Sequence, residues 1–239
     1  MSLHAANQPA EPGSGLLLSV QNVVKDYSAQ GAVVRALHGV SLDVAGGDFI
    51  ALVGPSGCGK STLLQLAGAL DFPTSGHILL NGLSTTGRTD QELTQLRRAV
   101  VGFVFQSFQL LHTLSVIENV EVPLMLAGRP SPRPTALDRL AWVGVEELAH
   151  RQVHQLSGGQ MQRVAIARAL AHDPKVLLAD EPTGNLDTAT GTAILDLLRS
   201  IARERQVGIV MATHSSEAAE IADRVVRMRD GRIVSETRN

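Results

Sequence analysis

Three segments near the start of the chain have the hydrophobic and polar pattern of β-strands. Residues 16–23, 33–44 and 76–80 are apolar runs broken by glycine or polar residues. Short runs of this kind, bounded by turn-forming residues, are typical of strands that expose one face to solvent. We therefore expect them to form short antiparallel strands.

A second group of segments is almost wholly apolar. Residues 48–53, 176–179 and 207–213 contain few or no polar side chains, which is typical of strands buried on both faces of a parallel sheet. A glycine-rich loop follows the first, Asp180 follows the second and His214 follows the third. Because open parallel sheets bind ligands beyond the carboxyl ends of their strands, we expect these three positions to converge on one site.

Helical patterns separate the predicted strands, and they identify the fold class as α/β. We expect helices near 60–70, 89–98, 159–172, 190–205 and 215–223. Residues 107–155 contain no strong strand pattern, so this region is predicted to be a mainly helical insertion. Its sequence RPSPRP, at 129–134, is expected to be a loop because it contains three prolines.

Composition narrows the class of protein without identifying it. Apolar residues make up 44% of the 239 residues and charged residues 18%, and the formal net charge is −2. These values are ordinary for a globular domain and give no reason to expect nucleic acid as a partner. Cys58 is the only cysteine, which excludes an internal disulfide and suits a reducing compartment. Residues 1–15 have neither a basic start nor an apolar stretch and are expected to be a disordered tail.

The sequence GPSGCGKS at 54–61 matches the phosphate-binding loop pattern G-x-x-x-x-G-K-[ST]. Glycines allow successive backbone N–H groups to surround a polyphosphate, and the following helix adds its positive end. Lys60 is expected to reach the β- and γ-phosphates, and the Ser61 hydroxyl is expected to bind magnesium. Cys58 is interpreted as a small space-filling residue; the alternative is a thiol whose alkylation blocks nucleotide binding.

An acidic pair, Asp180 and Glu181, ends the apolar run VLLA. Phosphoryl transfer requires a carboxylate that holds magnesium and a group that orients the attacking water. Asp180 fits the first role. Glu181 is expected on the opposite side of the chain, where it fits the role of general base.

The sequence LSGGQ at 156–160 precedes a helical pattern. Ser157 is a plausible N-cap, and the two glycines leave backbone N–H groups accessible at the positive end of the helix. This segment is a second candidate anion site.

LSGGQ followed by LLADEPTGNLD resembles the signature, Walker B and D-loop motifs of ABC-type ATPases. The resemblance covers about residues 16–235 and implies a P-loop NTPase (RecA-like) core with an antiparallel β-subdomain and an inserted α-helical subdomain. It divides the chain into a catalytic core, at 16–106 and 171–235, and a helical subdomain at 107–170 that carries the signature.

The family pattern also implies roles for single residues. Gln106 corresponds to the Q-loop glutamine that touches magnesium, Asp187 to the D-loop aspartate and His214 to the switch histidine. Tyr27 lies where the family stacks an aromatic ring on adenine. The expected catalytic residues are Lys60, Glu181 and His214, and the expected magnesium ligands are Ser61, Gln106 and Asp180. The expected nucleotide-binding residues are Tyr27, Gly54, Pro55, Ser56, Gly57, Cys58, Gly59, Lys60, Ser61, Thr62, Gln106, Ser157, Gly158, Gly159, Gln160 and Asp187.

The resemblance further implies partners. In this family the signature of one chain completes the ATP site of another, so we expect a homodimer that holds two Mg–ATP between its subunits and drives a separate transmembrane permease. Phe108 and Leu111 are hypothesised to line a groove for a short permease helix. The expected location is the cytoplasmic face of the cell membrane, as a peripheral subunit.

The segments ENVEVPLMLAG and EPTGNLD resemble the group that contains lipoprotein-release and macrolide-export ATPases. Alternatives are a subunit of an importer for a small solute and a soluble ABC ATPase without a permease. The second would typically contain two such domains in one chain. A chromosome-maintenance ATPase would need a long coiled coil between Gln106 and Leu156, and the segment between them is too short. A module without catalytic activity is disfavoured by the presence of Lys60, Asp180, Glu181 and His214.

Overall fold

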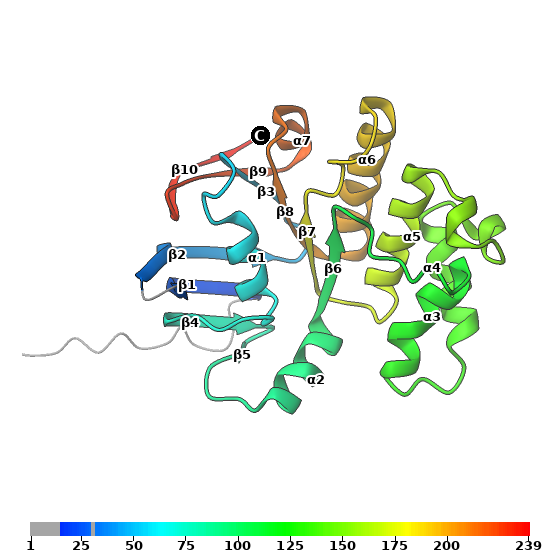
Figure 1. Cartoon of the computed structure of the whole chain (residues 1–239), viewed down its shortest axis with the longest axis horizontal. Coiled ribbons are helices and arrows are strands. Elements are labelled where there is room, and N and C mark those ends of the chain that lie inside the picture. The colour runs from blue at the N-terminus through cyan, green and yellow to red at the C-terminus, as the bar shows by residue number, and fades with distance from the viewer. Residues whose placement is uncertain (1–14, 30–31) are drawn as a thin grey trace, which may run out of the picture.

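The computed structural model describes residues 15–29 and 32–239, so the predicted tail lies outside the described residues except for Gly15. Two β-sheets and a group of helices make up the described part of the chain (Figure 1). In chain order the elements are β1 (Leu16–Ala29), β2 (Ala32–Ala45), β3 (Phe49–Val53), α1 (Lys60–Ala67), β4 (Ser75–Leu80), β5 (Leu83–Ser84), α2 (Asp90–Val100), β6 (Val101–Phe105), α3 (Val116–Leu126), α4 (Pro132–Trp142), η1 (Glu146–Leu148), η2 (Val153–Gln155), α5 (Gly158–Leu170), β7 (Val176–Asp180), α6 (Thr188–Arg205), β8 (Gly208–Thr213), α7 (Ser216–Ile221), β9 (Arg224–Arg229) and β10 (Arg232–Arg238).

The first sheet is antiparallel and has the strand order β2-β1-β4-β5, which confirms the prediction for the start of the chain. Its inward side chains, among them Leu18, Val20 and Val23, are fully buried. β1 runs to Ala29, further than the predicted strand at 16–23. It pairs with β2 along its whole length, through several register shifts.

The second sheet has the strand order β10-β9-β3-β8-β7-β6. β3, β8, β7 and β6 are parallel neighbours, and every residue of β3 and β8 is buried. The predicted parallel strands are therefore confirmed, and the carboxyl ends of β3, β8 and β7 meet at one edge. β9 and β10 were not predicted, because arginines interrupt their apolar pattern.

Alternate side chains of the parallel strands enter two different cores. Ile50 and Leu52 of β3 pack with α1, α2 and the antiparallel sheet. Phe49, Ala51 and Val53 pack on the other face, with the buried sides of α3, α4, α5, α6 and α7. The phosphate-loop helix α1 thus lies between the two sheets, whereas the other face of the parallel sheet is covered by helices.

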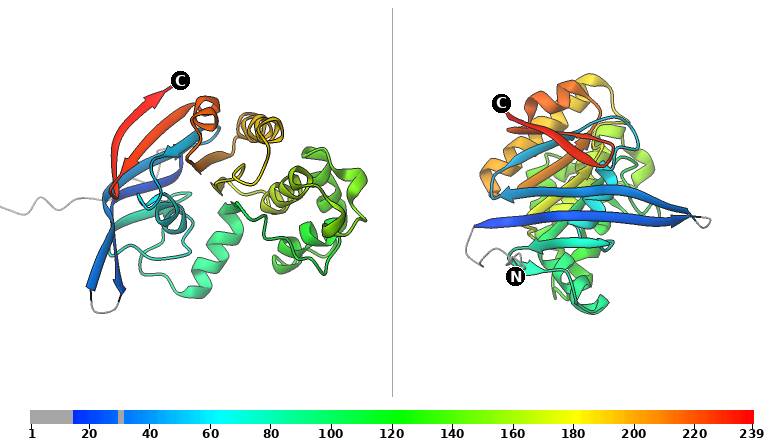
Figure 2. Two further views of the ribbon diagram at one scale, coloured as in Figure 1. Left: turned by 45° about the horizontal axis from the view of Figure 1, so that its top comes forward. Right: turned by 90° about the vertical axis from the view of Figure 1, so that its left-hand side faces the viewer.

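The chain between β6 and β7 forms a helical region that contains α3, α4 and α5. Figure 2 shows this region and the antiparallel sheet at opposite ends of the molecule. The prediction of a mainly helical insertion is confirmed, but the predicted loop at 129–134 is partly wrong. α4 begins at Pro132, because a proline in the first turn of a helix lacks only an N–H group that the helix does not use.

No helix in the described part of the chain is both long and apolar enough to cross a membrane.

Candidate nucleotide site

At two positions of the loop between β3 and α1, only glycine fits the observed backbone. Gly59, the N-cap of α1, has φ +103°. A Cβ on Gly59 would lie 2.8 Å from Leu37 Cδ2 and 2.9 Å from Ala36 O. A Cβ on Gly54 would lie 2.2 Å from Met228 O. Close packing against β2 and β9 therefore explains the glycines and holds the loop at the N-terminus of α1, where its backbone N–H groups favour an anion.

Lys60, at the start of α1, is buried. Its Nζ donates to Gly54 O at 2.7 Å and to Pro55 O at 3.2 Å, and lies 3.9 Å from Cys58 Sγ. The ammonium group is thus held at the centre of the loop by neutral carbonyl groups. Cys58 is only 3% exposed and packs in the core around α1, which favours its interpretation as a space-filling residue.

A polar pocket lies at the carboxyl ends of β6 and β7, and Ser61, Gln106, Asp180 and Glu181 line it together with Ser56. Burial is the main cause that raises the pKa of Asp180, and the charge of Glu181 adds to it; a hydrogen bond with Ser61 and the charge of Lys60 oppose the rise. A hydroxyl, a carboxylate and an amide oxygen are ligands that Mg²⁺ accepts, so this set fits the predicted cation.

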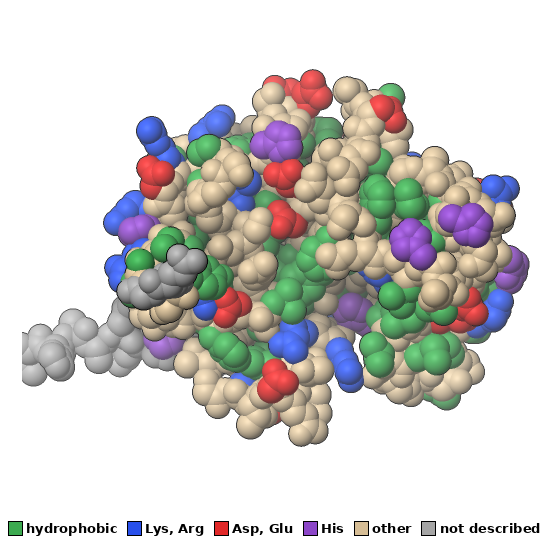
Figure 3. Space-filling model, in the orientation of Figure 1, with side chains coloured by type: hydrophobic (Ala, Val, Ile, Leu, Met, Phe, Trp, Pro, Cys, Tyr) green, Lys and Arg blue, Asp and Glu red, His purple; other side chains and the backbone are tan. Residues whose placement is uncertain are grey.

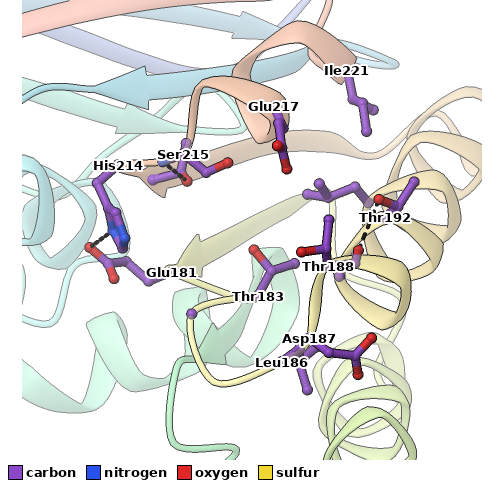
Figure 4. Close-up of a pocket in the computed structure, with 14 residues that line it drawn as sticks. Glu181, Thr183, Leu186, Asp187, Thr188, Thr192, His214, Ser215, Glu217 and Ile221 are labelled. Carbon is purple, nitrogen blue, oxygen red and sulfur yellow. Dashed lines mark hydrogen bonds and ion pairs between the residues drawn. The ribbon is translucent and has the colours of Figure 1, made fainter.

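Glu181 also borders a second pocket, where its side chain points toward His214 (Figure 4). Its Oε1 lies 3.1 Å from Nδ1 of His214. The Glu181 N–H donates to Ala212 O at 2.9 Å, and the residue has φ +48°, so the chain turns sharply after β7. The two carboxylates thus have different neighbours: Asp180 contacts Ser61 of the phosphate-loop helix, and Glu181 contacts the histidine that follows β8.

Gln106 follows β6, and its loop is held by two residues that sequence reasoning missed. Asn185 Nδ2 donates to Gln106 O at 2.9 Å. Arg168 of α5 donates to Gln109 O at 2.6 Å and to Phe108 O at 3.0 Å. Phe108 and Gln109 have φ +59° and +50°, a conformation that costs free energy in residues with a side chain. No sequence signal connects these contacts, because the partners lie far apart in the chain.

Tyr27 lies on β1 and is 37% exposed. Its hydroxyl group donates to Asp71 Oδ2 at 3.0 Å, and the side chain of Thr62 in α1 lies close to it. The structure therefore places the predicted stacking residue beside the first turn of the phosphate-loop helix.

The signature residues and Asp187 lie at helix starts. Ser157 Oγ accepts from the Gln160 N–H at 3.3 Å, and Asp187 accepts from the Thr190 N–H at 3.0 Å. Gly159 faces α6 so closely that a Cβ would lie 2.4 Å from Thr190 Cγ2. Asp187 borders the pocket that contains Glu181 and His214, whereas Ser157–Gln160 lines neither that pocket nor the one at Asp180. Within one chain, the two predicted anion sites are therefore not brought together.

A scan against known families matches residues 37–184 with the model described as "ABC transporter". The chain belongs to the ABC transporter family. The lipoprotein-releasing system ATP-binding protein of Anaeromyxobacter dehalogenans is 46% identical over 230 residues, covering 95% of this chain and 96% of that protein. A macrolide export ATP-binding/permease protein of Chlorobaculum tepidum is 44% identical over 221 residues, covering 92% of this chain but 34% of that protein.

Solved ABC structures confirm the predicted fold. The ATP-binding cassette MJ0796 of Methanocaldococcus jannaschii, solved as a dimer in a post-hydrolysis state bound to ADP and Pi, has a TM-score of 0.85 and is 40% identical, covering 92% of this chain and 98% of that one. The ABC ATPase core, the antiparallel sheet and the helical subdomain are all present in this chain. The division of the chain at 106/107 and 170/171 remains a prediction, and so do the roles of single residues.

Proposed function

We propose that this chain is the subunit of an ABC transporter that binds and hydrolyses Mg–ATP and drives a separate permease. The observation that carries the proposal is the divided acidic pair at the end of β7. Asp180 contacts Ser61 of the phosphate loop, while Glu181 lies 3.1 Å from His214. Cation binding and water activation need two carboxylates in such different surroundings.

In the proposed mechanism, backbone N–H groups of the phosphate loop and the N-terminus of α1 bind the phosphates. Lys60 exchanges the carbonyl groups of Gly54 and Pro55 for phosphate oxygens, which carry more negative charge. Ser61, Gln106 and Asp180 would hold Mg²⁺, which would neutralise part of the phosphate charge when bound. Burial makes an ionised Asp180 costly without a cation, and this supports its role as a ligand.

Glu181 is assigned to the attacking water. As a carboxylate it orients the water and accepts its proton, and the contact with His214 Nδ1 holds the carboxylate in place. His214 is exposed on its other side, where it is available to the γ-phosphate. Both side chains are positioned by strand ends, since β7 and β8 are neighbours in the parallel sheet.

A second copy of the chain completes the site in this proposal. The positive N-terminus of α5, at Ser157–Gln160, lies apart from the phosphate loop of its own chain. A partner in head-to-tail orientation would bring its α5 to the γ-phosphate bound by the first copy. The similar cassette MJ0796 was solved as a dimer, which supports an assembly of two copies.

An apolar groove between α2, β6 and α3 is the candidate contact with the permease. Its lining includes three apolar and two basic side chains: Leu70, Phe103, Leu126, Arg97 and Arg98. Leu70 and Leu126 are 49% and 59% exposed. Figure 3 shows basic side chains between apolar ones over α2 and α3. Such a surface suits an amphipathic helix.

The earlier hypothesis placed the groove at two other residues. Phe108 and Leu111 do not line the groove between α2, β6 and α3. Phe108 instead packs against the helical core, and Leu111 is 47% exposed. Leu111 remains a candidate contact on its own; Phe108 is better explained by packing.

The relatives favour a role in export, lipoprotein release or force transmission rather than in import. They also favour a location on the cytoplasmic face of the membrane. A lipoprotein-releasing ATP-binding protein and a macrolide export protein are among them. An importer of a small solute is the alternative.

A pull-down of the tagged full chain from detergent-solubilised native membranes tests the proposed partner. Recovery of a four-span permease with a large extracytoplasmic domain would support the proposal. A many-span permease together with a solute-binding protein would instead indicate an importer. Recovery of no membrane partner would contradict the transporter assignment.

A further inference from the structure

Lys25 is a buried cation next to the tyrosine assigned to the adenine ring. Lys25 and Tyr27 are two positions apart on β1, so their side chains leave the strand on the same face. The lysine is only 9% exposed. Its Nζ lies 4.8 Å from the centre of the Tyr27 ring and donates to Asp71 Oδ1 at 2.7 Å and Phe72 O at 2.8 Å. A carboxylate, a carbonyl group and an aromatic ring thus hold the ammonium group in place.

Asp71 connects the lysine to the tyrosine. One carboxylate oxygen accepts from Lys25, and the other accepts from the Tyr27 hydroxyl group at 3.0 Å. The Phe72 N–H donates to Oδ1 at 2.7 Å. Burial favours the neutral carboxyl group, but the hydrogen bonds from Lys25, Phe72 and Tyr27 together hold the pKa of Asp71 below its ordinary value. The carboxylate is therefore charged at neutral pH.

This arrangement fixes the tyrosine ring relative to the phosphate loop. Asp71 lies in the segment that follows α1, and α1 begins at Lys60 of the phosphate loop. Tyr27 also contacts Thr62 in the first turn of that helix. A salt bridge and a hydrogen bond thus hold β1 against the segment that directly follows the phosphate-loop helix. The ammonium group covers one face of the ring, so a base can stack on the other.

We propose that Lys25 and Asp71 are positioning residues that hold the Tyr27 ring as a platform for the adenine ring of the nucleotide. The inference rests on the proposed role of Tyr27. A ring that is already ordered loses less conformational freedom when the base binds, so the pair strengthens binding of the nucleotide without touching its phosphates. A cation over the ring and a charge-assisted hydrogen bond are each strong enough to hold one side-chain orientation.

The test compares a ligand that has a base with one that lacks it. Lys25→Met and Asp71→Asn are assayed for the KM of ATP and for the inhibition constant of tripolyphosphate, which carries the phosphates alone. We expect the KM of ATP to rise by about three- to tenfold in each variant. The inhibition constant of tripolyphosphate should stay within about twofold, because the phosphate loop is unchanged. Lys175→Met and Asp196→Asn, at exposed positions, are the matched controls.

Tyr27→Ala separates failure of this inference from failure of the proposed function. If Tyr27→Ala raises the KM of ATP while Lys25→Met and Asp71→Asn do not, the positioning role is wrong and the role of Tyr27 stands. If Tyr27→Ala itself has no effect, both assignments fail. If Asp71→Asn weakens the binding of ATP and of tripolyphosphate equally, the substitution has distorted the phosphate loop. That result would overturn the inference. In the Tyr27→Ala background, Asp71→Asn should add less than about twofold, since no platform is left to hold.

Discussion

At the residue scale, Asp180→Asn should stabilise the protein in the absence of nucleotide and magnesium. Burial first, and then the charge of Glu181, raise the pKa of Asp180 in the folded state. The folded protein therefore loses stability as the pH rises from the ordinary aspartate pKa through the raised one. We expect the Tm of Asp180→Asn to exceed that of the original chain by about 2 °C at pH 7.

The gain in Tm should disappear below about pH 3, because Asp180 is then protonated in both the folded and the unfolded state. Asp196→Asn, on the exposed side of α6, is the control and should show no such dependence on pH. A lower Tm for Asp180→Asn at neutral pH would contradict the assigned electrostatics.

Some residues of the site are recognisable in the sequence because they belong to a motif. The phosphate loop and the pair Asp180–Glu181 follow apolar strands, and these strands are neighbours in the parallel sheet. The residues that hold the site in place could not be predicted. Asp71 contacts Tyr27 from 44 positions away, and Arg168 contacts the loop of Gln106 from about 60 positions away. Only the packing of helices and strands creates these contacts, and no local sequence pattern indicates them.

At the scale of elements, the predicted strands and helices were confirmed where the pattern was strong, and the errors have physical causes. β9 reads RVVRMR, and its arginines obscure a strand whose apolar residues face the core. α4 begins with two prolines in its first turn, which sequence rules assign to a loop. The order of the strands in the parallel sheet was beyond prediction, because β6, β7 and β8 are joined by long helical connections.

The contact between α5 and the Gln106 loop gives a prediction at this scale. Arg168→Met removes both hydrogen bonds that hold the backbone of Phe108 and Gln109 at positive φ. We expect kcat for ATP to fall by about tenfold while the KM changes little, because Gln106 loses its place at the cation but the phosphate loop is intact.

Arg163→Met is the matched control for this prediction. Arg163 lies on the same helix but donates to Val143 O, away from the loop. In a Gln106→Ala background, Arg168→Met should have little further effect on kcat. A full additional loss in that background would show that the arginine acts through general stability.

At the scale of the whole molecule, the only tryptophan joins the helical region to the core. The guanidinium carbons of Arg139 and Arg205 lie 3.7 and 3.6 Å from the centre of the Trp142 ring. Two groups this close to one centre cannot share a face, so the ring is held between them. Trp142 ends α4, and Arg205 ends α6.

Arg205→Ala should therefore lower the free energy of unfolding by about 0.5–1 kcal/mol, the value of a cation–π contact at an exposed site. Chemical denaturation, followed by the fluorescence of Trp142, measures this directly. Arg203→Ala is the control. Arg203 forms an exposed ion pair with Asp223, so Arg203→Ala should lower the free energy of unfolding by less than Arg205→Ala does. If both substitutions lower the free energy of unfolding by the same amount, the contact with Trp142 contributes no more than an exposed ion pair.

In the proposed mechanism, two copies of this chain enclose ATP and Glu181 activates the attacking water. The most direct test is Glu181→Gln, which keeps the shape of the side chain but removes its basicity. With Mg–ATP we expect light scattering after gel filtration to show a stable dimer, and turnover to fall by at least about 100-fold. A variant that stays monomeric with Mg–ATP, or that hydrolyses ATP at close to the original rate, would contradict the account.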